Sequence, residues 1–157
     1  SSQKNLSSYS EKNIVDMSKK AFAIVVSEWN ESVTEALYQG AYDTLRQHGV
    51  SKENIVRKDV PGSFELPLAA QWAAENDAVD AVICLGCVIQ GETRHFDFIC
   101  DAVAHGIKDV NLKYNKPVIF GVLTTDNQQQ ALDRAGGKHG NKGDEAAITA
   151  IKMLAIK

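Results

Sequence analysis

The sequence predicts an α/β fold: a three-layer sandwich whose four-stranded parallel sheet carries helices on both faces. Short runs rich in branched apolar residues, typical of strands buried on both sides, recur along the chain. Helical segments alternate with them, and this order implies right-handed crossovers and a parallel sheet. The 157 residues, 44% hydrophobic and 24% charged, suit one globular domain. We expect that single domain over residues 13–157, after a flexible polar N-terminal arm at 1–12.

The first half of the chain contains two predicted strands and two helices. AFAIVVS at 21–27 is the first strand, and Asn30 is expected to cap the helix that follows. Apolar residues of this helix recur every four positions from Val33 to Leu45, and Gly49 ends it. NIVRKDV at 54–60 is the second strand. A turn at Pro61-Gly62 leads to a helix over about 65–75, which tolerates Pro67 in its first turn.

The second half repeats this alternation. VDAVICLG at 79–86 is the third strand, and a long helix is expected over about 94–114. We expect Phe98, Ala102, Ile107 and Val110 on its inward face. VIFGVLT, which follows Pro117, is the fourth strand. Helices near 127–135 and 144–156 are separated by a glycine-rich connection at 136–143.

Charge and composition argue against several classes of function. A net charge of −3 disfavours a broad electrostatic surface for nucleic acid. No apolar run approaches the roughly 18 residues of a membrane span, and the polar start lacks a signal core. The odd count of three cysteines argues against a disulfide framework and favours a reducing compartment. We therefore expect a cytoplasmic protein.

Polar residues follow each predicted strand, where ligands gather in parallel sheets. Four segments should converge there: 27–30, 61–65, 86–95 and 124–126. Together they hold aromatic rings, carboxylates, hydroxyls, amides and an imidazole. This set suits a polar planar heterocycle and a phosphate.

Residues 86–99, GCVIQGETRHFDFI, are the most informative stretch. A buried strand leads into the polar loop Gln90 to Arg94, and His95 lies in the first turn of the next helix. Unpaired backbone N–H groups at such a turn favour an anion. Because an imidazole in water has a pKa of ~6.5, it can carry a proton near neutral pH. The stretch therefore predicts a reaction site for a phosphorylated small molecule.

Other motifs in the chain carry less weight. Cys84-Leu85-Gly86-Cys87 spells C-x-x-C, but Cys84 belongs to the strand, whereas a redox pair opens a helix. Adding His95 and Cys100 matches no common zinc spacing, and no metal site is predicted. Neither a P-loop nor a G-x-G-x-x-G motif is present. The other histidines, at 48, 105 and 139, have no supporting neighbours and are expected on the surface or in packing.

The chain resembles the lumazine synthase family, the 6,7-dimethyl-8-ribityllumazine synthases of riboflavin biosynthesis. The likeness runs in order through about residues 13–157: SEWN, VPGSFELP, LGCVIQGETRHFDF, PVIFGVLTTDN and RAGGKHGNKG. It implies a flavodoxin-like fold and a defined reaction. In that reaction 5-amino-6-(D-ribitylamino)uracil condenses with 3,4-dihydroxy-2-butanone 4-phosphate, and phosphate and water leave. The family uses no metal or organic cofactor.

The resemblance also implies roles for individual residues. Those assigned to the pyrimidine and its ribityl chain are Trp29, Asn30, Ser63, Phe64, Glu65, Cys87, Val88 and Ile89. Trp29 would stack on the ring, and the main chain of 87–89 would contact the uracil edge. Glu92 and Thr93 would form the phosphate loop, and His95 would donate and shuttle protons. Without the resemblance, Phe64 would be a core residue, Glu65 a first-turn acid and His95 a packed helix-face histidine.

In the family the site lies between subunits, which bears on three further positions. Phe120 and Arg134 would come from the neighbouring chain, with Lys142 assisting. Arg134 offers a bidentate fork for phosphate, although a solvated helix arginine is the alternative. A homopentamer is expected, with an icosahedral shell of pentamers as the larger alternative and riboflavin synthase as a further partner. Two rivals stay open: a flavodoxin-like module that binds flavin or lumazine without turnover, and a shell protein with a vestigial site.

Overall fold

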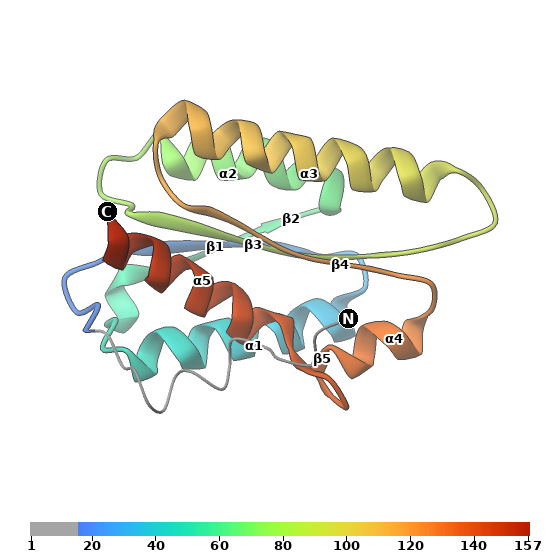
Figure 1. Cartoon of the computed structure of the whole chain (residues 1–157), viewed down its shortest axis with the longest axis horizontal. Helices are drawn as coiled ribbons and strands as arrows, with labels where there is room; N and C mark the ends of the chain where they lie inside the picture. The colour runs from blue at the N-terminus through green and yellow to red at the C-terminus, as the bar shows by residue number, and fades with distance from the viewer. Residues whose placement is uncertain (1–15) are drawn as a thin grey trace.

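The computed structural model describes residues 16–157 and places a parallel sheet between two layers of helices (Figure 1). The strands stand in the order β2-β1-β3-β4. Their bounds are β1 Phe22–Ser27, β2 Ile55–Val60, β3 Ala81–Ile89 and β4 Val118–Thr125. All three neighbouring pairs are parallel. The predicted α/β fold with a four-stranded parallel sheet is therefore confirmed.

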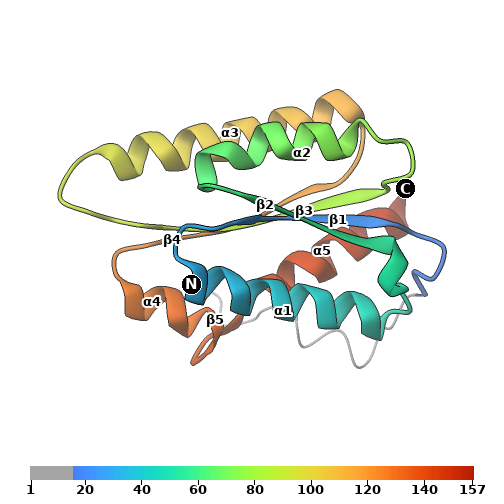
Figure 2. The ribbon, with the colours of Figure 1, turned by 180° about the vertical axis from the view of Figure 1, so that it is seen from behind.

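The helices divide between the two faces of the sheet (Figure 2). One face carries α1 (Glu31–Gln47) and α5 (Lys142–Ile156), which pack against each other. The opposite face carries α2 (Leu66–Ala74) and α3 (His95–Tyr114). This arrangement is the three-layer sandwich expected of a flavodoxin-like protein.

Each face of the sheet has its own hydrophobic core because successive strand residues point to opposite sides. Ile24 and Ile83 pack with α1 and α5, whereas Val25 and Val82 pack with α2 and α3. Every residue of β1 is buried, as is β3 through Cys87. Strands buried on both faces explain why these segments are continuous apolar runs.

Helix α1 follows the predicted pattern, except at its start. Its positions at 33, 37, 41 and 45 are all buried, and the chain leaves the helix through Gly49 at a φ of +89°. Asn30 precedes the helix, but its side chain makes no capping hydrogen bond. Instead, the Asn30 backbone carbonyl accepts hydrogen bonds from the N–H groups of Val33 and Thr34, at 3.0 Å each. The predicted side-chain cap at Asn30 is therefore wrong.

Two predictions for the third strand and the helix after it also need correction. Strand β3 runs to Ile89, three residues beyond the predicted end at Gly86. In α3 the buried positions are Val103, Ile107 and Val110. Phe98 is 65% exposed and Ala102 is exposed, so neither faces the sheet. Spacings of three and four residues must alternate to stay on one helix face, and residues 103, 107 and 110 satisfy this rule.

The glycine-rich connection is a folded hairpin rather than a loop. Helix α4 (Gln128–Asp133) leads into strands β5 (Ala135–Gly137) and β6 (Gly140–Asn141), which pair antiparallel. Helix α5 then begins at Lys142, two residues earlier than predicted, because the Asn141 side chain caps it. The Asn141 Oδ1 accepts a hydrogen bond from the Gly143 N–H at 2.7 Å.

Two further predictions concern the N-terminal arm and His48. The arm predicted at 1–12 lies outside the described residues. His48 is a packing residue: it is buried, and its Nδ1 donates to the Thr44 carbonyl at 2.9 Å. Within residues 16–157, none of the helices combines the length and the apolar character that crossing a bilayer demands.

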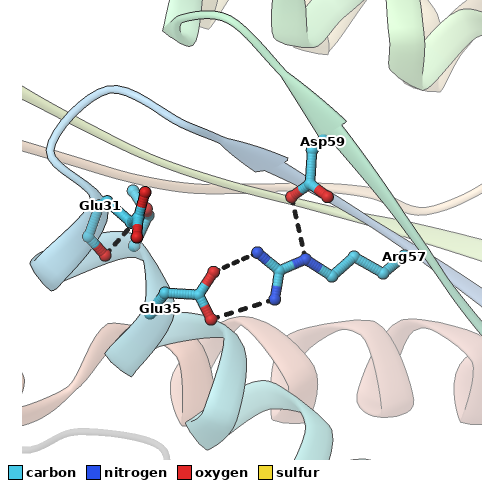
Figure 3. A network of polar contacts seen from close by, with 5 residues as sticks. Glu31, Glu35, Arg57 and Asp59 are labelled. Atoms are coloured by element: carbon cyan, nitrogen blue, oxygen red, sulfur yellow. Dashed lines mark hydrogen bonds and ion pairs between the residues drawn. The ribbon is translucent and has the colours of Figure 1, made fainter.

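An ion-pair network covers the outer edge of the sheet at β2 (Figure 3). The Arg57 guanidinium bridges Glu35 of α1 and Asp59 of its own strand, with a distance of 2.9 Å from Nε to the Asp59 Oδ1. The same guanidinium lies 4.4 Å from the centroid of the Tyr38 ring. The hydrogen bond from Arg57 holds the pKa of Glu35 below its ordinary value. This network attaches α1 to the edge strand.

We expect Glu35→Gln to lower the free energy of unfolding at neutral pH by less than about 1 kcal/mol, because the pair is exposed to solvent. A carboxylate with a lowered folded-state pKa stabilises the protein above its unfolded pKa of ~4.3. That stability is lost as the pH falls through the folded value. Urea unfolding at about pH 7 and about pH 3 should therefore show the difference between variant and wild type disappearing in acid. Glu53→Gln is the control, since Glu53 has no ion-pair partner among residues 16–157. A constant difference at both pH values would contradict the assignment.

Candidate active site

A cavity of about 480 Å³ opens where β1 and β3 end. The strand order reverses between these two strands, because β1 leads outward to β2 while β3 leads to β4 on the other side. Ligands of doubly wound sheets bind at such a switch point. Three of the four predicted segments line this first cavity. The predicted site residues among them are Trp29, Asn30, Ser63, Phe64, Glu65, Cys87, Val88, Ile89 and His95.

The loop after β1 brings an exposed ring and a constrained amide to this cavity. Trp29 is 72% exposed, and its backbone N–H donates to the Pro61 carbonyl at 3.2 Å. Asn30 has a left-handed backbone with φ 63°, a conformation that asparagine tolerates better than most residues. Its Nδ2 donates to the Cys87 carbonyl at 3.0 Å. The amide thus ties the loop after β1 to the end of β3 and leaves the Trp29 ring free to stack.

The end of β3 presents unpaired main chain to the same cavity. Strand β1 pairs with β3 only as far as Val26 opposite Leu85. On its other side, β3 remains paired with β4 as far as Ile89 opposite Thr125. Backbone groups of Val88 and Ile89 that face away from β4 therefore lack a strand partner. Such an edge can bind the donors and acceptors of a planar heterocycle.

The turn after β2 also lines the cavity. Ser63 and Glu65 belong to a short 3₁₀ helix (η3, Ser63–Glu65), and Phe64 is 57% exposed, contrary to the core position that the residue type favours. The Ser63 Oγ is buried without a partner and lies 2.6 Å from the place of a Cβ on Gly86. Glycine at 86 is therefore what lets the turn approach the sheet. Within residues 16–157, Ser63 and Ser27 carry the buried side-chain oxygens that lack a hydrogen bond.

The loop at 90–94 is exposed to solvent, and the cavity wall resumes at His95, the first residue of α3. His95 lines the first cavity, whereas Glu92 and Thr93 are exposed and lie outside its wall. The His95 N–H donates to the Thr93 Oγ1 at 3.4 Å. The Arg94 guanidinium rests 5.8 Å from the centroid of the Phe98 ring. The phosphate-loop roles of Glu92 and Thr93 therefore stay predictions.

The C-x-x-C sequence does not form a redox pair. Cys84 packs in the core under α2 and α3, and Cys87 packs in the core under α1 and α5, on the other face of β3. Burial raises the pKa of the Cys84 thiol to about 12 and that of Cys87 to about 11, so both stay protonated. Nowhere in residues 16–157 do three histidine, cysteine or acidic side chains gather as a metal site would require.

A second cavity, of about 560 Å³, lies at the free edge of the sheet. The two residues predicted to serve a neighbouring chain, Phe120 of β4 and Arg134 after α4, meet here with Lys142, which was predicted to assist, at the start of α5. Phe120 is not a core residue. Its side chain is 39% exposed because β4 is an edge strand of the sheet. His139 lies on the same wall. Sequence reasoning missed His139 because the hairpin that brings it there was not predicted.

The two cavities share no lining residue and differ in charge. The first contains Glu65 and His95 but neither lysine nor arginine. The second contains Arg134 and Lys142 with one carboxylate, Asp133. Thr124 and Thr125 also line the second cavity, so the fourth predicted segment does not join the other three. Within one chain, the imidazole and the guanidinium predicted to act together are therefore in different cavities.

Comparisons with known proteins identify the family. A family model described as 6,7-dimethyl-8-ribityllumazine synthase matches residues 19–157. A protein of that name from Cytophaga hutchinsonii is 70% identical over 155 residues, which are 99% of this chain and 97% of that protein. A protein of the same name from Parabacteroides distasonis is 57% identical over 150 residues, which are 96% of this chain and 94% of that protein. Another, from Flavobacterium johnsoniae, is 54% identical over 154 residues, which are 98% of this chain and 81% of that protein. The chain therefore belongs to the 6,7-dimethyl-8-ribityllumazine synthase family, transferase enzymes of riboflavin biosynthesis.

Proposed function

We propose that the protein condenses 5-amino-6-(D-ribitylamino)uracil with 3,4-dihydroxy-2-butanone 4-phosphate to 6,7-dimethyl-8-ribityllumazine, with release of phosphate and water. The observation that carries this proposal is the first cavity, which joins a free indole ring, unpaired main chain and an imidazole at one switch point. Family membership supports the same reaction. The proposed chemistry needs no metal or organic cofactor, because amine, carbonyl and leaving phosphate all belong to the substrates.

The first cavity suits the pyrimidine substrate. Its ring would stack on Trp29 while the backbone of Val88 and Ile89 holds its polar edge. The ribityl hydroxyls would meet the turn at 63–65, where the Glu65 carboxylate can accept hydrogen bonds and backbone amides can donate them. These contacts would hold the 5-amino group in a fixed direction. Fixing one reactant in this way supplies much of the rate gain in a two-substrate reaction.

The proton transfers are assigned to His95. The 5-amino nitrogen attacks the butanone carbonyl and water leaves to form an imine. Phosphate is then eliminated, and ring closure releases further water. An imidazole at the cavity wall can give a proton to the leaving oxygen and take one from the attacking nitrogen. The backbone N–H groups of Glu92 and Thr93, rather than the Glu92 carboxylate, would hold the phosphate at the loop just before His95.

The phosphate requires a cation that the first cavity does not contain. We propose that the second cavity of a neighbouring chain closes over the first, so that Phe120, Arg134 and Lys142 complete the site. The separation of imidazole and guanidinium within one chain supports this arrangement. A homopentamer is the proposed assembly, a shell of pentamers is the larger form, and riboflavin synthase is a further proposed partner. A light-scattering mass of one chain in active protein would refute the shared site.

The proposed place of action is the cytoplasm. The three cysteines are free, as a reducing compartment requires. The proposed domain covers residues 13–157, with 1–12 as an arm.

A direct assay tests the proposed function. The purified chain, given both substrates, should form a product with lumazine fluorescence and release phosphate in step with it. Phosphate release without lumazine, or ligand binding without turnover, would refute the proposal and favour a binding module. Omitting either substrate is the control.

Replacing Arg134 with alanine should raise KM for the butanone phosphate by roughly tenfold or more, because a charge-assisted contact to phosphate contributes about 1.5–3 kcal/mol. KM for the ribitylaminouracil should change much less. Steady-state kinetics with each substrate varied in turn measures both values. Arg134→Lys keeps the charge but loses the bidentate fork. Its KM for the butanone phosphate should therefore lie between those of wild type and Arg134→Ala. Equal effects on both KM values would contradict the assignment.

A further inference from the structure

His139 shares the wall of the second cavity with the two cations assigned above to the phosphate, Arg134 and Lys142. The sequence provides no sign of this placement, because His139 belongs to neither a strand run nor a helix face. The β5–β6 hairpin turns it back toward the end of α4. Imidazole is the side chain whose ordinary charge change falls between pH 5 and 8, whereas guanidinium and ammonium groups are charged throughout that range.

Main-chain hydrogen bonds fix the backbone of the segments that carry these side chains. The His139 N–H donates to the Asp133 carbonyl at 2.7 Å, and the Lys142 N–H donates to the Arg134 carbonyl at 2.7 Å. Gly136 and Gly140, with φ values of +102° and +85°, allow the hairpin to turn tightly enough for both bonds. The backbone of His139 is therefore anchored to the residue next to Arg134.

The charges around His139 favour an anion. Helix α4 and its end contribute Asp133 and Arg134, the hairpin contributes Lys138, and α5 contributes Lys142. The Asp133 carboxylate accepts a hydrogen bond from Gln129 Nε2 at 2.9 Å, which engages one of its oxygens. Strand β4 adds only uncharged residues to the cavity. Cationic groups outnumber the single carboxylate on this wall.

We propose that His139 is a third ligand for the tetrahedral oxyanion in the second cavity, and that its protonation tightens anion binding in mildly acidic solution. This inference rests on the proposed function, since it concerns the pocket assigned to the substrate phosphate. It adds a pH-dependent component to a site whose other two cations keep their charge. Turnover at low concentrations of the phosphate substrate would then depend on pH through binding as well as through proton transfer.

Inorganic sulfate is the probe of choice, because phosphate itself changes charge near pH 6–7 whereas sulfate remains a dianion. Calorimetric titration of the full-length protein at constant ionic strength, between about pH 5.5 and 8.5, would span the ~6.5 of a free imidazole. Sulfate affinity of the wild type should rise roughly threefold to tenfold as the pH falls, the effect of one added charge near a protein surface. His139→Ala should bind sulfate weakly at every pH. His139→Lys should bind it tightly at every pH.

Control variants separate this inference from the proposed function. His105→Ala, an exposed histidine of α3 outside both cavities, should keep the wild-type pH dependence. The inference would be overturned if the pH dependence of sulfate affinity survived in His139→Ala and vanished in His95→Gln. Wild-type protein that forms lumazine but binds no sulfate would also overturn it, and the proposed function would then stand. Sulfate binding that Arg134→Ala leaves unchanged would instead refute the proposed anion pocket, and absence of lumazine would refute the reaction.

Discussion

Replacing His95 with alanine should lower kcat for lumazine formation by roughly tenfold to a thousandfold, the usual contribution of a positioned acid–base group. His95 is exposed in the single chain, at the first turn of α3 and on the wall of the first cavity. Its removal therefore costs little packing, and KM for either substrate should change by a smaller factor than kcat. Stopped-flow fluorescence of product formation, with both substrates saturating, measures the effect.

A matched histidine on the same helix is the control. His105 is also exposed on α3, but it lines neither cavity, and His105→Ala should keep the wild-type kcat. Added imidazole should restore part of the activity of His95→Ala, because a small base can enter the space that the side chain left. A merely structural role would show no such rescue. A kcat equal to that of wild type in His95→Ala would remove the proton-transfer role from this residue.

The sequence predicted the sheet because its strands are buried on both faces. The runs at 21–27 and 79–86 are continuous and apolar, so both the strands and their parallel order could be inferred. Their carboxyl ends then had to lie together. Three segments predicted to meet at that edge, from Trp29 to His95, do line one cavity.

Other features depend on pairing and packing that no local pattern encodes. Strand β3 continues past Gly86 because β4 remains beside it, and this extension creates the unpaired edge at Val88 and Ile89. The Asn30 amide bonds the Cys87 carbonyl rather than its own helix, a contact across 57 residues of sequence. Nor does the sequence show that Thr124 belongs to the second cavity.

The glycine-rich connection shows how one composition can serve several purposes. Glycines at 136 and 140 take positive φ values in the hairpin. Glycine is common at such positions both in flexible loops and in tight turns, so composition does not distinguish the two. Gly143 is different, because it is the second residue of α5, and glycine is less favourable than alanine in a helix by up to about 1 kcal/mol. Composition alone predicted a loop for all of them. Only the packing of α5 on α1 shows why residue 143 lacks a side chain.

Gly143→Ala should destabilise the protein by about 3 kcal/mol or more, although alanine is the better helix former. An added Cβ would overlap the Leu37 carbonyl oxygen of α1 and would lie 2.7 Å from the Leu37 carbonyl carbon and 2.9 Å from the Asn141 Oδ1. Two of these atoms belong to the backbone of α1 at the buried residue Leu37, so the clash can be relieved only by moving α5 away from α1. The clash therefore outweighs the gain in helix propensity, which is at most about 1 kcal/mol.

Urea unfolding at one protein concentration, followed by far-UV circular dichroism, measures this loss. Gly91→Ala is the matched control, since a Cβ there would meet nothing within 4 Å and should leave the midpoint almost unchanged. Movement of α5 would also displace Lys142, whose N–H is bonded to the Arg134 carbonyl, and so disturb the second cavity. KM for the butanone phosphate should therefore rise in Gly143→Ala under conditions where the protein is still folded. A midpoint at or above that of wild type would show that α5 can shift freely, and would contradict the rigid packing from which both effects are inferred.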